Sequence, residues 1–252
     1  MIVRSPDELS LASPLGRVRA VTKLGLALAW LVGLALVVDP RPPIVVALSA
    51  ALAGVAFGAI RPAALFRGVA PLSLAAVGVG VFNALFSAAN GDPLQPVALS
   101  VGPVRLTEVA LVGGLALGLR ILAIATVGVV FALTTDSTAL VDGLVQQLRV
   151  PERFGYGALA AYQAVPRLAA NLATLRQARR IRGLRGSWHP RILVGLLVLA
   201  IRHGDRLALA MDARGFGSAR RTRYREVRWG PIDALALVVG LVVIVAALAT
   251  AD

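Results

Sequence analysis

The sequence predicts an all-α protein: a polytopic membrane helix bundle of about five spanning helices, with a cytoplasmic helical insertion before the last span. Three observations support this fold class. Of the 252 residues, 58% are hydrophobic and only 15% are charged. The mean hydropathy is +0.79, which is typical of membrane proteins rather than soluble domains. The net charge is +13, and most of the basic residues lie between Arg149 and Arg228, ahead of the last apolar run.

Five apolar runs reach or approach the roughly 20 residues that a helical span needs. Prolines separate several runs, because proline removes a backbone donor and restricts the chain direction. The predicted spans are residues 24–38 (extendable to Val21), 44–60, 69–88, 109–133 and 232–249. The sequence therefore divides into an N-terminal transmembrane bundle over 1–133, an insertion over 134–230 and a final transmembrane helix within 231–252.

Two features interrupt this pattern. Between the third and fourth spans, alternating Val97, Leu99 and Val101 predict either a short hairpin or a segment lying on the surface. Arg120 lies inside the fourth span, where an ionisable side chain is costly. We expect Arg120 either to snorkel towards the membrane surface or to find an internal partner.

The positions of the basic residues predict the orientation, since arginine and lysine in short loops remain in the cytoplasm. Basic residues precede the first span, lie between the second and third, and dominate residues 149–228. The opposite loops hold only Arg41 and Arg105. Five spans then place the N-terminus in the cytoplasm and the C-terminus outside. The apolar run 192–201 is too short to cross the cell membrane.

The insertion is predicted to be helical, because its apolar residues recur at three- and four-residue spacing. Its first helix follows good N-capping residues around Asp136 and stops before Pro151, and Pro166 is expected to kink the second. The first predicted helix starts after N-capping residues within 134–137, and the other two cover about 152–185 and 191–214.

The second and third of these helices end alike, with an arginine followed by a glycine. The two ends are Ile181-Arg182-Gly183 and Ala213-Arg214-Gly215. The last carbonyls of a helix favour a nearby cation, and glycine lets the backbone turn and another surface approach. Each arginine could then enter a carboxylate- or carbonyl-lined groove on a partner. The alternative is plain helix capping, with a basic face attracted to anionic lipid.

Over nearly its whole length the chain resembles the transmembrane T component of energy-coupling factor transporters, the ABC-type importers of vitamins and of cobalt or nickel ions. The matching residues lie after the fourth span and in the two long helices of the insertion. They are Thr134-Thr135, Leu140, Leu144, Pro151, Val165-Pro166, the run 177–183, the run 208–217 and Arg221-Thr222-Arg223-Tyr224.

The resemblance implies partners and site residues. In that family, two Ala-Arg-Gly motifs end cytoplasmic coupling helices that seat in a pair of ATP-binding cassette ATPase subunits. By resemblance, Ala213-Arg214-Gly215 is the second motif. The first falls on Ile181-Arg182-Gly183, preceded by Ala178, and isoleucine replaces the usual alanine.

The resemblance also implies a substrate-binding S component in the membrane. We expect its contact surface to be the apolar face of the insertion. The residues of that face are Leu140, Leu144, Leu148 and the run 192–201. The chain would act as a connecting scaffold, and the sequence leaves open both the substrate and whether the two ATPases are identical.

The sequence predicts no chemistry in the chain itself. A phosphate-binding loop needs a lysine followed by Ser or Thr, whereas the only lysine, Lys23, precedes Leu24. There is no cysteine, and neither histidine has another histidine or a carboxylate at the spacing of metal ligands. We therefore predict no catalytic residue, metal, cofactor or nucleic-acid partner. Two other functions compete: a membrane enzyme acting on a phosphorylated lipid, and a stand-alone secondary transporter. Scattered acidic residues and the lack of an inverted repeat argue against them.

Overall fold

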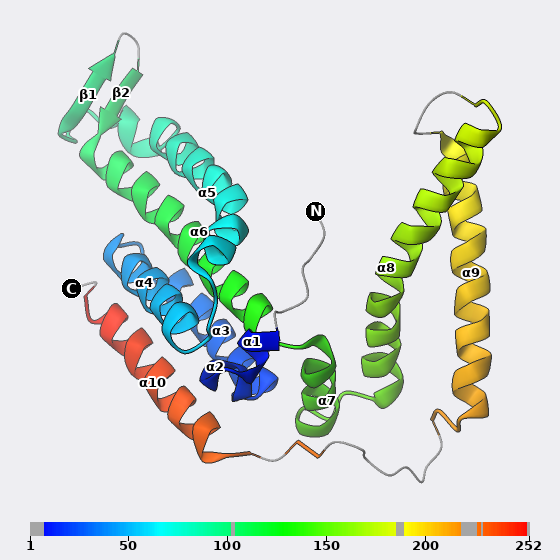
Figure 1. Ribbon diagram of the computed structural model, residues 1–252. Coiled ribbons are helices and arrows are strands. Elements are labelled where there is room, and N and C mark those ends of the chain that lie inside the picture. The colour runs from blue at the N-terminus through cyan, green and yellow to red at the C-terminus, as the bar shows by residue number, and fades with distance from the viewer. Residues whose placement is uncertain (1–7, 102–103, 185–188, 218–225, 228, 251–252) are drawn as a thin grey trace. The chain divides into compact units, whose positions relative to one another are not determined.

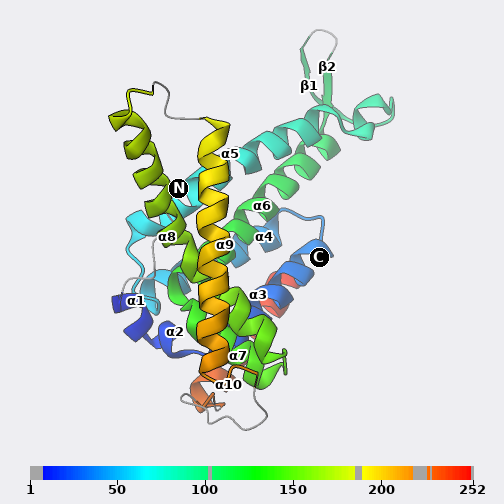
Figure 2. The same cartoon turned by 90° about the vertical axis from the view of Figure 1, so that its right-hand side faces the viewer.

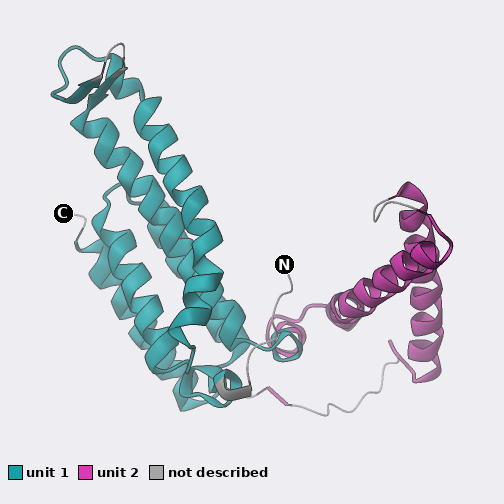
Figure 3. Cartoon of the chain, turned by 45° about the horizontal axis from the view of Figure 1, so that its top comes forward, with its two compact units in different colours: residues 1–140, 228–252 teal, residues 141–227 magenta. Residues whose placement is uncertain are grey.

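The computed structural model describes residues 8–101, 104–184, 189–217, 226–227 and 229–250 (Figure 1 and Figure 2). The chain divides into two units, one of residues 1–140 with 228–252 and one of residues 141–227 (Figure 3). The predicted all-α class is confirmed, and within the described residues the only sheet is a two-stranded hairpin.

The first unit holds the apolar helices. Among the residues that the structure describes, three helices are long and apolar enough to cross a membrane: α5 (Pro62–Leu85, extended by the 3-10 turn Ala88–Gly91), α6 (Glu108–Thr134) and α10 (Pro231–Leu248). Two shorter apolar helices accompany them, α3 (Ala20–Ala35) and α4 (Arg41–Ala56). Two short helices precede them, α1 (Glu8–Ala12) and α2 (Pro14–Arg17). All five predicted spans are therefore helical, and the chain is a multi-pass membrane protein.

Helices α3 and α4 are shorter than a full span, at 16 residues each, or about 24 Å. Pro42 and Pro43 form the first turn of α4 instead of a loop, since proline is tolerated where no backbone donor is needed. Because α3 ends at Ala35, the carbonyl of Val37 lies beyond the helix. Arg120 of α6 donates a hydrogen bond to that carbonyl through Nη2, so its partner is internal.

A buried cluster joins α3, α4, α6 and α10. Its members are Leu34, Val46, Ala123, Ile244 and Ala247, each at most 6% exposed. The indole Nε1 of Trp30 donates to the carbonyl of Gly240 at 2.8 Å, which links α3 to α10. Outside this cluster large apolar side chains are widely exposed, as expected where lipid rather than water surrounds the helices.

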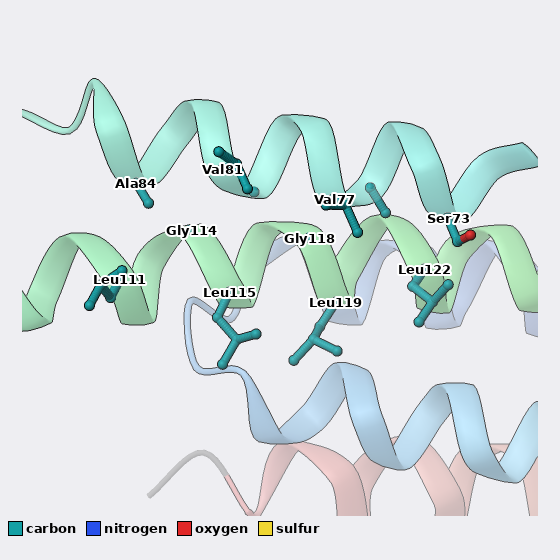
Figure 4. A pocket seen from close by; sticks show the side chains of 12 residues that line it. Ser73, Val77, Val81, Ala84, Leu111, Gly114, Leu115, Gly118, Leu119 and Leu122 are labelled. Carbon is teal, nitrogen blue, oxygen red and sulfur yellow. The ribbon is translucent and has the colours of Figure 1, made fainter. Parts of the chain in front are cut away.

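Helix α5 packs on α6 along a seam of small residues. A Cβ atom added to Gly114 would lie 2.5 Å from the carbonyl oxygen of Gly80 and 2.8 Å from the Cβ of Ala84. Such backbone contact is the usual way that membrane helices approach closely. Beside the seam lies an apolar groove of about 330 Å³, lined by Val77, Val81, Leu115 and their neighbours (Figure 4).

The connection between α5 and α6 is a hairpin, one of the two predicted possibilities. Strands β1 (Val97–Val101) and β2 (Val104–Thr107) pair antiparallel. Asn90 holds the hairpin to both helices: its Nδ2 donates to the carbonyl of Ala84 at 2.7 Å, and its Oδ1 accepts from the amide of Thr107 at 3.0 Å.

The described part of the second unit consists mainly of three helices. They are α7 (Ser137–Gln147), whose first residues belong to the first unit, α8 (Glu152–Ile181) and α9 (Pro190–Ala213). These helices agree with the predicted positions to within four residues at each end. Helix α8 continues through Pro166, which removes one hydrogen-bond donor from its middle.

Candidate coupling site

Helix α7 is tied to the start of α8. The Asp136 carboxylate caps α7 by accepting from the amide of Ala139 at 3.1 Å, as the sequence predicts. Val145 packs on Gly155 of α8 so closely that a Cβ there would lie 2.6 Å from Val145 Cγ2. The Tyr156 hydroxyl donates to Asp142 Oδ1 at 2.9 Å. These contacts connect the last turns of α7 to the first turns of α8.

Helices α8 and α9 lie side by side and antiparallel (Figure 1 and Figure 2). Leu175 of α8 covers Gly195 of α9, at 3.5 Å from a Cβ built on that glycine, and Ile192 is 3% exposed. Elsewhere along the pair, small residues line a groove of about 350 Å³ between the two helices. Its small residues are Gly157, Ala160, Ala161, Ala164, Ala200, Gly204 and Ala208.

Both Arg-Gly helix ends adopt the same hydrogen-bonded termination. After α8, the amide of Gly183 donates to the carbonyl of Arg180 at 3.0 Å, and that of Leu184 donates to the carbonyl of Arg179 at 3.2 Å. Gly183 has φ +70°, the left-handed conformation that glycine adopts most easily. This pair of bonds is the Schellman motif, which satisfies the last carbonyls of a helix.

The end of α9 repeats this arrangement residue for residue. The amide of Gly215 donates to the carbonyl of Asp212 at 2.9 Å, and that of Phe216 donates to the carbonyl of Met211 at 3.0 Å. Gly215 has φ +73°. In both cases the arginine is the residue directly before the left-handed glycine, so the two backbones place Arg182 and Arg214 alike.

The two tips lie at opposite ends of the α8–α9 pair. Helix α8 ends beside the start of α9 (Figure 1 and Figure 2), and α9 has 24 residues. At 1.5 Å per residue, Arg182 and Arg214 are separated by about 36 Å. A single groove on a partner cannot receive both tips at that separation.

Both guanidinium groups are available to a partner. Arg182 and Arg214 are exposed, and neither guanidinium group makes a hydrogen bond or ion pair with another described residue. Ile181, the residue that differs from the expected alanine, is 88% exposed and therefore does not pack against the chain itself. Ala178, one turn earlier, is half-buried.

A substitution at Gly183 tests whether the left-handed turn is needed. A Cβ there would meet nothing within 4 Å, so Gly183→Ala changes only the backbone preference. We expect a loss of about 1 kcal/mol and faster hydrogen exchange at the amides of Gly183 and Leu184. Gly157→Ala, also in open space but with ordinary helical φ, is the control and should be neutral or stabilising. If the amides of residues 183 and 184 exchanged at the same rate in both variants, the left-handed turn at Gly183 would not be needed.

Part of the apolar contact surface that the sequence predicts on the insertion is exposed. On α9, a stripe of large side chains is exposed by 43–62%: Leu193, Val194, Leu197, Val198 and Ile201. Leu148, just beyond the end of α7, is 58% exposed, whereas Leu140 and Leu144 are half-buried. The spacing of the α9 stripe places it along one face of the helix.

Reasoning from the sequence missed one set of contacts, at the N-terminus. Ser10 and Lys23 donate to the last carbonyls of α6, and Arg19 contacts Asp233 of α10. Only Ser13-Pro14, a capping residue followed by a proline at the first helical position, signals the helix α2 in this stretch. The partners are distant in the chain and carry no local signal.

Comparison with known proteins agrees with this architecture. The described helices define a multi-pass membrane protein that carries a unit of amphipathic helices with two arginine-bearing ends. The family model for the cobalt transport protein, CbiQ, matches residues 12–224. The chain belongs to this family, which makes it a transmembrane T component of the energy-coupling factor transporter type.

Individual relatives bear related names. The chain is 27% identical over 209 residues to the energy-coupling factor transporter transmembrane protein EcfT of Lactococcus lactis, covering 76% of each chain. It is 30% identical over 159 residues to the protein of that name from Streptococcus thermophilus, covering 56% of this chain and 60% of that one. A putative ABC transporter ATP-binding protein of Bifidobacterium longum is 27% identical over 193 residues, which cover 70% of this chain and 24% of that longer protein.

Proposed function

We propose that this chain is the scaffold that couples ATP hydrolysis by two separate ATP-binding cassette subunits to substrate import. The observation that carries the proposal is the pair of helix ends with the same hydrogen bonds, each presenting an exposed arginine whose guanidinium has no partner among the described residues. Closure of an ATPase dimer would move the tips at Arg182 and Arg214, and the helices behind them would pass that movement on. Coupling in the thermodynamic sense also requires that the orientation of the S component changes the conformational equilibrium of the ATPase subunits.

The separation of the tips supports a partner with two similar sites. About 36 Å between the arginines suits two grooves on the two halves of a dimer better than two grooves on one small subunit. The match to 24% of a longer protein named as ATP-binding supports the same class of partner. The exposed Ile181 alters the shape of the first tip and so distinguishes the two contacts.

The orientation follows from the charges. The N-terminus and the unit of residues 141–227 lie in the cytoplasm, where ATP is available, and the C-terminus lies outside. The ion pair between Arg19 and Asp233, 3.8 Å from Nε to Oδ2, supports this arrangement because it holds the starts of α3 and α10 at the same membrane face. Both helices then run outwards.

Copurification tests the proposed function. The tagged full-length chain, extracted from its native membrane in mild detergent, should bring down subunits that carry a phosphate-binding loop and hydrolyse ATP. The complex reconstituted in vesicles should transport substrate only when ATP is present on the side of the membrane that carries the ATPase subunits. Transport or hydrolysis by the purified chain alone would instead support a secondary transporter or a membrane enzyme.

The apolar stripe on α9, with Leu148, is proposed as the contact surface for the substrate-binding S component. We expect Leu197→Gln combined with Leu148→Gln to weaken binding of the S component about tenfold or more, because two apolar side chains lose their buried contacts. ATPase subunits should still copurify. The control is Val165→Gln on α8, where valine is 58% exposed but lies outside the stripe. Unchanged S-component binding in the double variant would overturn the assignment.

A further inference from the structure

The chain passes between its two units at two places, and one N-terminal segment binds the helix of the first unit that lies next to each. The first crossing is inside α7, between residues 140 and 141, shortly after α6 ends at Thr134, and the second is between residues 227 and 228, shortly before α10 begins. Residues 10–23, which include α2 and the first turn of α3, make polar contacts with the end of α6 and the start of α10. We call this segment the collar.

Before the first crossing, the collar, which is residues 10–23, binds the C-terminal carbonyls of α6. Ser10 Oγ donates to the carbonyl of Leu133 at 2.9 Å, and Lys23 Nζ donates to that of Thr134 at 2.5 Å. These carbonyls lack partners within the helix and carry partial negative charge, so a cation stabilises them. Lys23 is 8% exposed and Thr134 is fully buried, which shields the interaction from water.

Lys23 has no acidic partner among the described residues, so its buried charge is balanced by the end of α6. A buried cation held by one helix terminus is costly to leave unpaired. Any fraying of α6 at Thr134 would remove that carbonyl and strand the ammonium group. The contact therefore opposes movement of Thr134, the last residue of α6, after which the chain continues through Asp136 into α7.

After the second crossing, Asp233 joins the first turn of α10 to the collar. Its Oδ1 accepts from the amide of Arg19 at 2.7 Å, and its Oδ2 accepts from the amide of Gly230 at 3.0 Å. Asp233 is 3% exposed. Arg19, the N-cap of α3, and Lys23 are four residues apart, or about one helical turn. The start of α3 therefore contacts both the end of α6 and the start of α10.

The collar is itself fastened to the membrane bundle. The amide of Leu15 donates to the carbonyl of Phe57 at the end of α4, at 2.9 Å. The Ser13 hydroxyl donates to the carbonyl of Ser10 at 2.5 Å, and Val18 is 5% exposed. Helices α3, α4, α6 and α10 are thus connected at one end through residues 10–23.

We propose that the collar is the anchor of the coupling movement, and that Lys23 is a positioning residue for transport. Because the collar holds the end of α6 and the start of α10 on the bundle, a displacement of the arginine tips would move the membrane helices together, instead of being absorbed by unwinding at Thr134. This inference rests on the proposed function. It assigns to residues 10–23 a role that neither tip residue performs.

The test is Lys23→Gln in the full complex with its ATPase and S-component partners, measured as substrate imported per ATP hydrolysed. The glutamine cannot supply the charge, so we expect a fall of about tenfold in that ratio, with ATP hydrolysis and ATPase copurification retained. Hydrogen exchange at the amides of residues 135–140 should become faster. Lys23→Arg, which keeps a cationic donor, should recover part of the ratio.

Arg17→Gln is the matched control, because Arg17 is exposed and the substitution removes the same charge from the same segment. It should leave the ratio unchanged, and an equal loss in both variants would overturn the proposal. Ser10→Ala offers a milder change in case Lys23→Gln fails to insert, and should lower the ratio several-fold. An unchanged ratio in Ser10→Ala, or in an inserted Lys23→Gln, overturns the collar role. Failure of the proposed function is distinct, since Arg214→Glu would then also leave transport intact.

Discussion

Reversing the charge at Arg214 is expected to abolish transport while leaving the protein inserted in the membrane. The side chain is exposed on a hydrogen-bonded helix end, so Arg214→Glu would replace the proposed contact with a carboxylate- or carbonyl-lined groove by repulsion. Losing such a contact costs about 2 kcal/mol or more, which weakens ATPase binding about 30-fold or more. Copurification of the ATPase subunits and uptake in vesicles measure the two effects.

The control is Arg206→Glu, eight residues earlier on α9, where the arginine is also exposed and the charge change is identical. It should retain most of the ATPase binding, since Arg206 is not at the helix end. Normal transport by Arg214→Glu would refute the coupling role of the α9 tip. Similar losses in both variants would point to the general basic face, which is the anionic-lipid alternative.

Substituting Gly114 is expected to have the largest effect on folding. In Gly114→Leu the new Cβ would lie 2.5 Å from the carbonyl oxygen of Gly80, a backbone atom that can move only if α5 moves. Overpacking of this kind costs about 3 kcal/mol or more. Most of the protein should then fail to give a monodisperse peak in detergent size-exclusion chromatography, and the remainder should unfold at a lower temperature.

Gly113→Leu is the matched control for this experiment. The neighbouring glycine is half-buried, and a Cβ on it would meet nothing nearer than Asn83 Oδ1 at 3.9 Å. The two variants add the same side chain to adjacent residues of α6, so lipid exposure and helix propensity change almost equally. Equal stability of the two would mean that the α5–α6 seam does not depend on backbone contact.

Much of the fold is predictable from local patterns. The five apolar runs are all helical, and the helices of the insertion start and stop close to their capping residues, prolines and glycines. The Arg-Gly ends are predictable for the same reason: a glycine that can adopt positive φ terminates a helix wherever it follows one, as Gly183 and Gly215 do. These signals act over a few residues.

The lengths of the helices are less predictable. The run 24–38 predicts a span ending near Val38, yet α3 ends at Ala35. The carbonyl of Val37, beyond the helix, accepts a hydrogen bond from Arg120. Hydrophobicity alone cannot distinguish an apolar residue in a helix from one in the turn after it. The choice depends on the donor that α6 supplies from 83 residues away.

The sequence by itself determined the membrane class, the helical insertion and the two arginine ends, because composition, 3.6-residue periodicity and turn chemistry are local properties. Only the tertiary structure decided that Lys23, which the sequence counts among the basic residues before the first span, is buried against Thr134, 111 residues away. It likewise paired Arg19 with Asp233 across 214 residues. Such partners are selected by packing, since a buried polar group takes whichever acceptor the close approach of the helices brings within reach.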